Sequence, residues 1–130
     1  MLYKDLTEKI LQAFFKVNNT LGYGFLEKVY ENALAYELKK MGFQVLQQQK
    51  IKVYYDGHQV GDYFADIIVD DQVILEIKAA EDLCEEHEAQ LINYLRATKY
   101  EVGLLLNFGK KADFRRKIFT NDRKRLLEHG

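Results

Sequence analysis

Residues 64–78 read FADIIVDDQVILEIK, two apolar runs of strand character separated by a short polar turn. Both runs are rich in isoleucine, valine and leucine, as is typical of buried strands. Three ionisable residues interrupt them: Asp66 in the first run, and Glu76 and Lys78 in the second. A charge buried in an apolar strand costs several kcal/mol unless another group compensates it. The stretch therefore predicts a β-hairpin whose ionisable residues are the first candidates for a functional site.

Strand geometry predicts where these three side chains point. Side chains alternate across a strand, so Glu76 and Lys78 share one face. If the turn consists of residues 70–72, the two residues that flank it pair, and Asp66 lies directly opposite Glu76. Directly opposed residues share a face, with Cβ atoms about 4.5–5.5 Å apart. Two carboxylates at that separation repel each other unless a cation or a proton lies between them.

Oxygen ligands favour a hard cation, so the two carboxylates predict a Mg²⁺ or Mn²⁺ site that retains several waters. Such an ion lowers the pKa of a bound water and neutralises the charge that builds on a phosphate. Lys78 is placed to orient the attacking water or to stabilise the oxyanion. The three residues therefore suit hydrolysis of a phosphodiester. An ion-pair network that only holds the sheet together is the alternative that these residues leave open.

The rest of the chain alternates between helical and strand patterns. The predicted helices cover residues 5–21, 26–40 and 85–98. The predicted strands cover residues 43–55, 58–69, 73–79, 101–108 and 114–119, followed by a helical or frayed end. A helix that crosses over between the third and fourth strands favours a parallel pair. The order ααβββαββ therefore predicts an α/β fold with a mixed central sheet flanked by helices.

Length and composition favour one compact unit. The chain has 130 residues, 48% of them hydrophobic, and no proline, which suits a single domain over residues 1–130. Its start is soon charged, and no apolar run approaches the roughly 20 residues of a membrane helix, so we expect a soluble, cytoplasmic protein. The single cysteine, Cys84, excludes an intramolecular disulfide, and its spacing to His87 gives only half of a zinc site.

The net charge of −1 conceals an uneven distribution. Residues 110–130 carry eight lysines and arginines against three acids, a local charge of +5. The remaining 109 residues carry 11 basic and 17 acidic residues, a charge of −6. A basic end is a candidate for contact with a nucleic-acid backbone, and a solvated tail is the alternative. The candidate contact residues include Lys110, Lys111, Arg115 and Arg116.

Helical positions add three candidates. Gln90 and Tyr94 lie four residues apart, on one face of the predicted helix that follows Lys78. Gln90 is placed to hold a metal-bound water or a phosphate, and Tyr94 to contact a nucleic-acid backbone. Glu27, at the start of the second predicted helix, is a candidate third acid. Each also has a simpler interpretation, because Gln90 can be solvated, Tyr94 can belong to the core, and Glu27 can stabilise a helix N-terminus.

Two motifs of this chain resemble those of a known family. Gly24-Phe-Leu-Glu27-Lys-Val-Tyr30 is similar to the motif for which the GxxExxY protein family is named. Asp66…Glu76-Ile-Lys78, followed by Gln90-Leu-Ile-Asn-Tyr94, resembles the core of the PD-(D/E)xK nuclease superfamily, to which that family is assigned. The resemblance extends from the first predicted helix to Asn107-Phe108-Gly109. It departs in one place, because Ala65 rather than proline precedes the first acid.

The resemblance implies a restriction-endonuclease-like core and Mg²⁺-dependent cleavage of DNA. By the pattern of the superfamily, Asp66 and Glu76 would be metal ligands and Lys78 the catalytic lysine. Glu27 would be the accessory acid of the first core helix. Gln90 and Tyr94 would be the glutamine–tyrosine motif of exonuclease-like members.

We therefore expect a small nuclease that uses Mg²⁺ or Mn²⁺ to hydrolyse DNA, in repair or defence. The alternative is a catalytically silent nuclease fold that binds nucleic acid or a protein partner. DNA and RNA, and endo- and exonucleolytic cleavage, stay open as alternatives. A chain of this size offers little surface for specificity, which leaves room for a homodimer or a partner subunit.

Overall fold

The structure is a computed structural model that describes residues 2–126. Within that range the helices are α1 (Lys4–Leu21), α2 (Glu27–Lys40) and α3 (Glu85–Arg96). The strands are β1 (Val45–Tyr55), β2 (His58–Val69), β3 (Val73–Lys78), β4 (Val102–Asn107) and β5 (Asp113–Ile118), followed by a 3-10 turn at Asn121–Arg123. The predicted order ααβββαββ is confirmed, and the predicted ends lie within about two residues of the observed ones.

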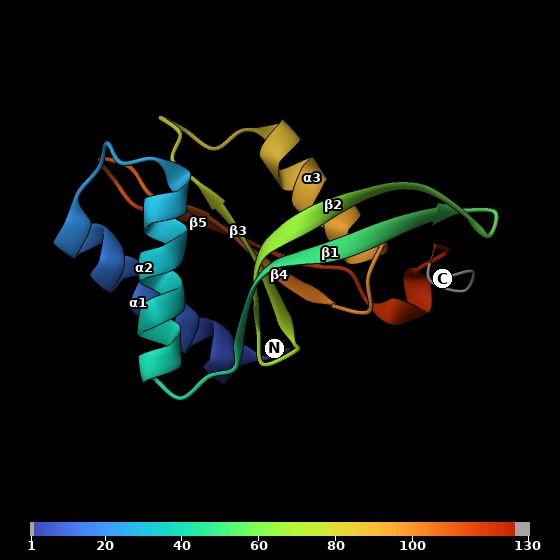
Figure 1. The fold of residues 1–130 in the computed structure, drawn as a ribbon, viewed down its shortest axis with the longest axis horizontal. Helices are drawn as coiled ribbons and strands as arrows, with labels where there is room; N and C mark the ends of the chain where they lie inside the picture. The colour runs from blue at the N-terminus through green and yellow to red at the C-terminus, as the bar shows by residue number, and fades with distance from the viewer. Residues whose placement is uncertain (1, 127–130) are drawn as a thin grey trace.

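A five-stranded mixed sheet in the order β1-β2-β3-β4-β5 forms the centre of the fold (Figure 1). As predicted, β3 and β4 are parallel, and the other neighbouring strands are antiparallel. Helices α1 and α2 cover one face of the sheet, and α3 covers the other. The β1–β2 hairpin is about twice as long as the other strands and projects beyond them (Figure 1).

The apolar core lies in two layers because the middle strands of the sheet are buried on both faces. Below α1 and α2, side chains such as Ile67 and Leu75 are fully buried. On the opposite face, Ile74 packs with Leu91 of α3. Helix α3 lies so close to β4 that a Cβ atom at Gly103 would be 2.7 Å from Cδ1 of Leu91. A glycine at this position therefore sets how closely α3 can approach the sheet.

The register of the β2–β3 hairpin agrees with the prediction. Val69 pairs with Val73, and regular pairing continues to Ile67 and Leu75. The next residues along the two strands are the two acids of the predicted site, and regular pairing ends before them. The hairpin therefore delivers both acids to the point where β2 and β3 separate.

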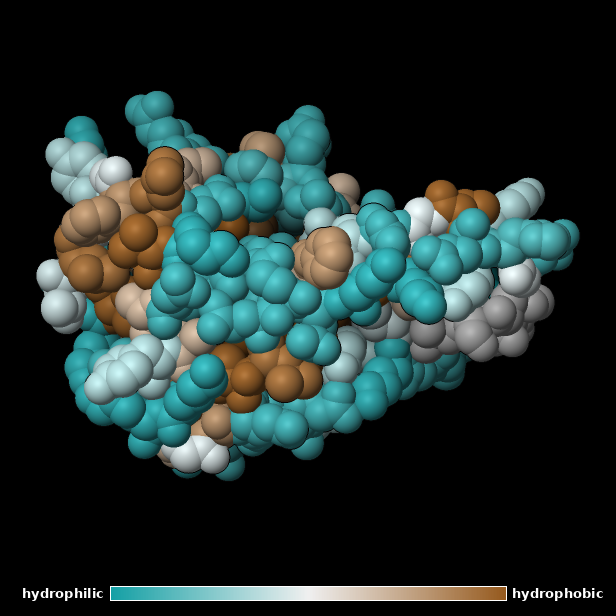
Figure 2. Space-filling model, viewed as in Figure 1, coloured by the Kyte–Doolittle hydropathy of each residue, from teal (hydrophilic) through white to brown (hydrophobic). Residues whose placement is uncertain are grey.

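The face of the molecule shown in Figure 2 is mostly hydrophilic, with an apolar area over the α1–α2 turn at the left. Tyr23, Phe25 and Leu26 of this turn are 60%, 47% and 81% exposed. None of the helices within residues 2–126 is long and apolar enough to cross a membrane.

Candidate active site

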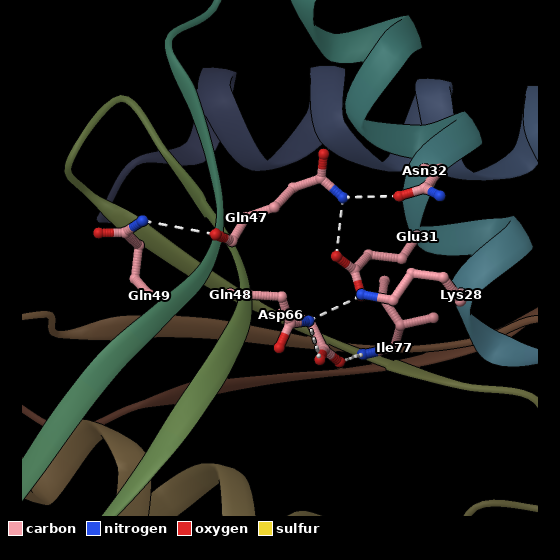
Figure 3. Close-up of polar contacts among 8 residues, drawn as sticks. All are labelled: Lys28, Glu31, Asn32, Gln47, Gln48, Gln49, Asp66 and Ile77. Carbon is pink, nitrogen blue, oxygen red and sulfur yellow. Dashed lines mark hydrogen bonds and ion pairs between the residues drawn. The ribbon is translucent and has the colours of Figure 1, made fainter.

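Asp66 lies at the fork between β2 and β3 and is held through both carboxylate oxygens. Its Oδ2 accepts a hydrogen bond from the backbone N–H of Ile77 at 2.8 Å, and its Oδ1 accepts one from Nε2 of Gln48 at 3.2 Å (Figure 3). The alternation of faces is interrupted here, because Ala65 and Ile68 are three residues apart and both pack on the α3 side. The carboxylate is therefore directed along the fork, a detail that simple alternation did not predict, and each oxygen keeps a lone pair for a cation.

Glu76 is a buried acid with an unsatisfied oxygen. Its side chain is only 6% exposed, and Oε1 has no hydrogen-bond partner within the described chain. Burial, together with the charge of Asp66, raises the pKa of Glu76 from 4.5 to about 9, and Lys78 opposes this shift only in part. A carboxyl group in this position holds a proton at neutral pH unless a cation replaces that proton. The unsatisfied oxygen beside a second acid fits a divalent cation.

The side chains available as ligands at the candidate site favour Mg²⁺ or Mn²⁺ over zinc. Within residues 2–126, no group of three or more His, Cys, Asp or Glu side chains is placed to hold an ion. Mg²⁺ commonly binds one or two carboxylates and keeps several waters, so the pair Asp66 and Glu76 fits Mg²⁺ or Mn²⁺. Cys84 and His87 belong instead to the start of α3, where the backbone N–H of Cys84 donates to Nδ1 of His87 at 3.3 Å.

Lys78 ends β3 on a firmly held backbone. Its carbonyl accepts a hydrogen bond from the N–H of Phe108 at 2.8 Å, and it lies opposite Asn107 in the parallel β3–β4 pairing. The Asn107 side chain accepts from the N–H of Ala80 and donates to its carbonyl, both at 2.9 Å. The amide of Asn107, which the sequence did not single out, thus fixes the chain just beyond Lys78. Alternation along β3 places Lys78 on the same face as Glu76.

Helix α3 brings its predicted residues to the acids. Burial, together with the charges of Glu76 and Asp66, raises the pKa of Tyr94 to about 12, while hydrogen bonding with Gln90 acts in the opposite direction. The Tyr94 ring stacks on Tyr63 of β2 at a centroid distance of 3.8 Å. The structure therefore places Gln90 and Tyr94 together on the α3 side of the two acids.

The segment from Gly24 to Tyr30 contains a buried residue that holds the α1–α2 turn, Tyr30, and an exposed residue that lines a groove, Glu27. Tyr30 is fully buried, and its hydroxyl donates to the carbonyl of Gly22 at 2.6 Å and accepts from the N–H of Phe25 at 3.2 Å. These bonds close the α1–α2 turn. Glu27 is exposed at the start of α2 and lines an open groove of about 600 Å³ that it shares with Asp66. Glu27 therefore faces the space in front of the candidate site.

A second acid of α2, Glu31, also reaches the site, and the sequence interpretation missed it. Its Oε1 accepts from Nε2 of Gln48 at 2.9 Å, and the same nitrogen donates to Asp66 (Figure 3). Its Oε2 accepts from Nε2 of Gln47 at 2.7 Å, and Nζ of Lys28 contacts Oε1 at 3.0 Å. The available signal was an acid in an apolar spacing, because residues 31, 34, 35 and 38 are all buried on one side of α2.

The basic residues near the C-terminal end divide between two environments. Lys110 and Lys111 line a second open groove, of about 790 Å³, beside the α1–α2 turn. Nζ of Lys110 lies 5.3 Å from the centre of the Tyr23 ring. Both lysines are exposed and are placed to meet a ligand in this groove.

Arg115 and Arg116 are engaged within the chain. Nη1 of Arg115 lies 2.8 Å from Oδ1 of Asp113, and its Nε lies 3.9 Å from Glu88 of α3. Arg116 lies on the opposite face of β5, where it donates to the carbonyl of Leu2. Successive residues of a strand face opposite sides, so Arg115 and Arg116 do not share one face of β5.

A mixed sheet flanked by helices, with two acids and a lysine at a strand fork, defines a restriction-endonuclease-like α/β fold. A profile of the PD-(D/E)XK nuclease superfamily matches residues 4–117, and the chain belongs to this superfamily. The crystal structure of SSO0001 is similar, with a TM-score of 0.59 and 16% identity over 91% of this chain. This chain spans 60% of the length of that protein, and at this identity the likeness shows the fold alone. No curated protein matches the chain.

Proposed function

We propose that the protein is a nuclease that uses Mg²⁺ or Mn²⁺ to hydrolyse DNA phosphodiester bonds at Asp66, Glu76 and Lys78. The observation that carries the proposal is the buried Glu76, whose orphaned oxygen lies beside a second acid. Burying two acids for structure alone is rarely favourable. Membership in the nuclease superfamily supports the same function, and so does the resemblance of residues 24–30 to GxxExxY proteins.

The residues around the acids have complementary roles in this proposal. A Mg²⁺ ion held by Asp66 and Glu76 would supply an activated water and a counter-charge for the phosphate. Lys78 stabilises the negative charge that develops on the phosphoryl oxygens. Tyr94 is protonated at physiological pH, as an ordinary tyrosine is, and its raised pKa of about 12 keeps it so beside the acids, so its hydroxyl can donate to a phosphate oxygen. Gln90 orients that hydroxyl or a water beside it.

The grooves suggest the path of the nucleic acid. Glu27 lines the groove in front of Asp66, where it serves as the accessory acid. Lys110 and Lys111 line the neighbouring groove and contact the phosphate backbone. Replacing both lysines by alanine should reduce the steepness with which the logarithm of the DNA association constant falls with the logarithm of the salt concentration, by roughly 1–2. An unchanged slope would place the backbone contacts elsewhere on the chain.

Cleavage assays decide whether the protein is an enzyme. Plasmid and single-stranded DNA are incubated with Mg²⁺ or Mn²⁺ and the wild type, Lys78→Ala or Lys99→Ala. Removing Lys78 should reduce the rate roughly 10²–10³-fold. The matched control, Lys99, is an exposed lysine paired with Asp71, and its removal should leave the rate unchanged. Equal cutting by the wild type and Lys78→Ala would indicate a contaminating nuclease and remove the enzymatic proposal.

The exposed apolar turn Tyr23–Leu26 favours one alternative, a nuclease fold that binds a partner without cutting. Retained DNA or protein binding, with no cleavage under any divalent cation, would favour this alternative. Calorimetric titration with Mn²⁺ then separates a silent metal site from a purely structural ion pair, because the latter binds no divalent cation.

A further inference from the structure

Glu31 is a buried acid whose charge is compensated by an unusually complete set of donors. It is only 3% exposed and occupies an otherwise apolar spacing on the buried side of α2. Lys28, Gln47 and Gln48 all donate to its two oxygens at 2.7–3.0 Å. A helix that only packed on the sheet would be served as well by an apolar residue, since buried charges are weak contributors to stability. The acid therefore points to a role beyond packing.

Gln48 has a backbone conformation that glutamine rarely adopts. Its φ is 55°, in the left-handed region that favours glycine. It falls between the paired positions Gln47–Ile67 and Gln49–Ala65, where regular β1–β2 pairing skips both Gln48 and Asp66. Such a conformation costs about 1–3 kcal/mol and is concentrated at functional sites. The backbone strain coincides with the position from which the Gln48 side chain reaches Asp66.

One nitrogen of Gln48 bridges the two carboxylates. Its Nε2 lies 2.9 Å from Oε1 of Glu31 and 3.2 Å from Oδ1 of Asp66. An amide nitrogen carries two hydrogens in a fixed plane, so both bonds constrain the rotation of the amide. Glu31 thereby orients Gln48, and Gln48 orients Oδ1 of Asp66 while Ile77 holds Oδ2 (Figure 3).

We propose that Glu31 and Gln48 are positioning residues that orient Asp66 toward a divalent cation, so that α2 contributes to the affinity of a site built on the sheet. The inference rests on the proposed metal site at Asp66 and Glu76. Without Gln48, Oδ1 of Asp66 loses the donor that holds it, while Oδ2 keeps the bond from Ile77, so the carboxylate is free to rotate about that bond. Partners that orient a metal ligand typically change metal affinity or activity by about 10–100-fold.

Binding of Mn²⁺ to the protein without DNA tests the proposal independently of catalysis. Gln48→Gly removes the bridge, and glycine adopts a positive φ without strain, so the melting temperature should not fall. Gln47→Ala is the matched control because Gln47 contacts Glu31 and Asn32 but not Asp66. We expect Gln48→Gly to weaken Mn²⁺ binding about 10-fold or more, and Gln47→Ala to leave the affinity within about 2-fold.

A conservative exchange adds a second readout. Glu31→Gln keeps an acceptor for Gln48, so it should weaken Mn²⁺ binding less than Glu31→Ala does. In cleavage assays, kcat should fall with Gln48→Gly while KM for DNA changes little, because Gln48 acts through Asp66 rather than through the nucleic acid.

Two results would overturn the inference and leave the proposed function standing. Equal Mn²⁺ affinity in the wild type and Gln48→Gly would show that Asp66 needs no orientation from α2. Equal weakening by Gln47→Ala and Gln48→Gly would show that the contacts only hold α2 against β1. A wild-type protein that binds no Mn²⁺ would instead overturn the metal site itself, and the inference with it.

Discussion

Replacing Glu76 by glutamine should stabilise the metal-free protein at neutral pH and abolish the proposed nuclease activity. Burial and the charge of Asp66 raise the pKa of Glu76 from 4.5 to about 9. Between these two pH values the folded protein binds a proton at Glu76 that the unfolded chain has released. The free energy of unfolding therefore falls as pH rises from 4.5 toward 9. A glutamine amide resembles the protonated carboxyl and does not titrate, so the variant escapes this loss.

The size of the effect follows from the two pKa values. One pKa unit corresponds to about 1.36 kcal/mol. Because pH 7 lies 2.5 above the ordinary pKa of 4.5, retaining the proton in the folded state costs about 3 kcal/mol at that pH. For a chain of this length the gain from Glu76→Gln corresponds to roughly 10 °C in melting temperature. At pH 5, only half a unit above the ordinary pKa of 4.5, the same argument gives less than about 1 kcal/mol.

Thermal unfolding in EDTA at several pH values between 5 and 8 measures this gain. Glu81→Gln serves as the control, since Glu81 is exposed in the loop after β3. The difference between Glu76→Gln and the wild type should widen steadily with pH, and the control should show no such trend. A constant difference, or a Glu76→Gln protein less stable than the wild type at pH 7, would refute the argument that Glu76 is an uncompensated buried acid.

Three further predictions concern the turn, the helix contact and the cation. Tyr30→Phe removes the hydroxyl that closes the α1–α2 turn and should lower the free energy of unfolding in urea by about 1–2 kcal/mol, whereas Tyr36→Phe on the exposed side of α2 should change it by less than about 0.5 kcal/mol. Gly103→Ala forces a Cβ against Leu91 and should cost about 1–3 kcal/mol in the same titration; an unchanged midpoint would show that α3 can shift freely. Binding of Mn²⁺ at pH 7 should release close to one proton from Glu76. The released proton makes the calorimetric heat of binding depend on the ionisation enthalpy of the buffer, and Glu76→Gln should abolish this dependence.

The sequence was sufficient to predict the β2–β3 hairpin and its register. The turn residues 70–72 are polar and the flanking runs are apolar, so only one register buries both strands. Pairing of Val69 with Val73 follows from that turn, and β2 has the predicted bounds of His58 to Val69. Helix order and the parallel β3–β4 pair were equally accessible, because they depend on local periodicity and on the handedness of the crossover.

The contacts around Asp66 could not be predicted in the same way. Among the described residues, Glu31 is linked to Asp66 through Gln48. The position of the Gln48 side chain depends on a positive φ in the middle of a strand, which leaves no pattern in the sequence. The use of Arg115 within the chain depends on where α3 places Glu88, a contact between distant segments. Local patterns assign each residue to a face, but they do not say which polar groups from other elements will meet it.

Ile77 has two separate roles: its backbone N–H holds Asp66, and its side chain fills the interior of the protein. Every amino acid except proline supplies a backbone N–H, so the orientation of Asp66 does not depend on which side chain lies between Glu76 and Lys78. The Ile77 side chain is 1% exposed and packs beneath α1 and α2 on the other face of the sheet. Substitution at position 77 is consequently limited by the space available in the interior and not by the reaction at the candidate site. This gives a physical reason why the residue between Glu76 and Lys78 can vary while the acid and the lysine cannot.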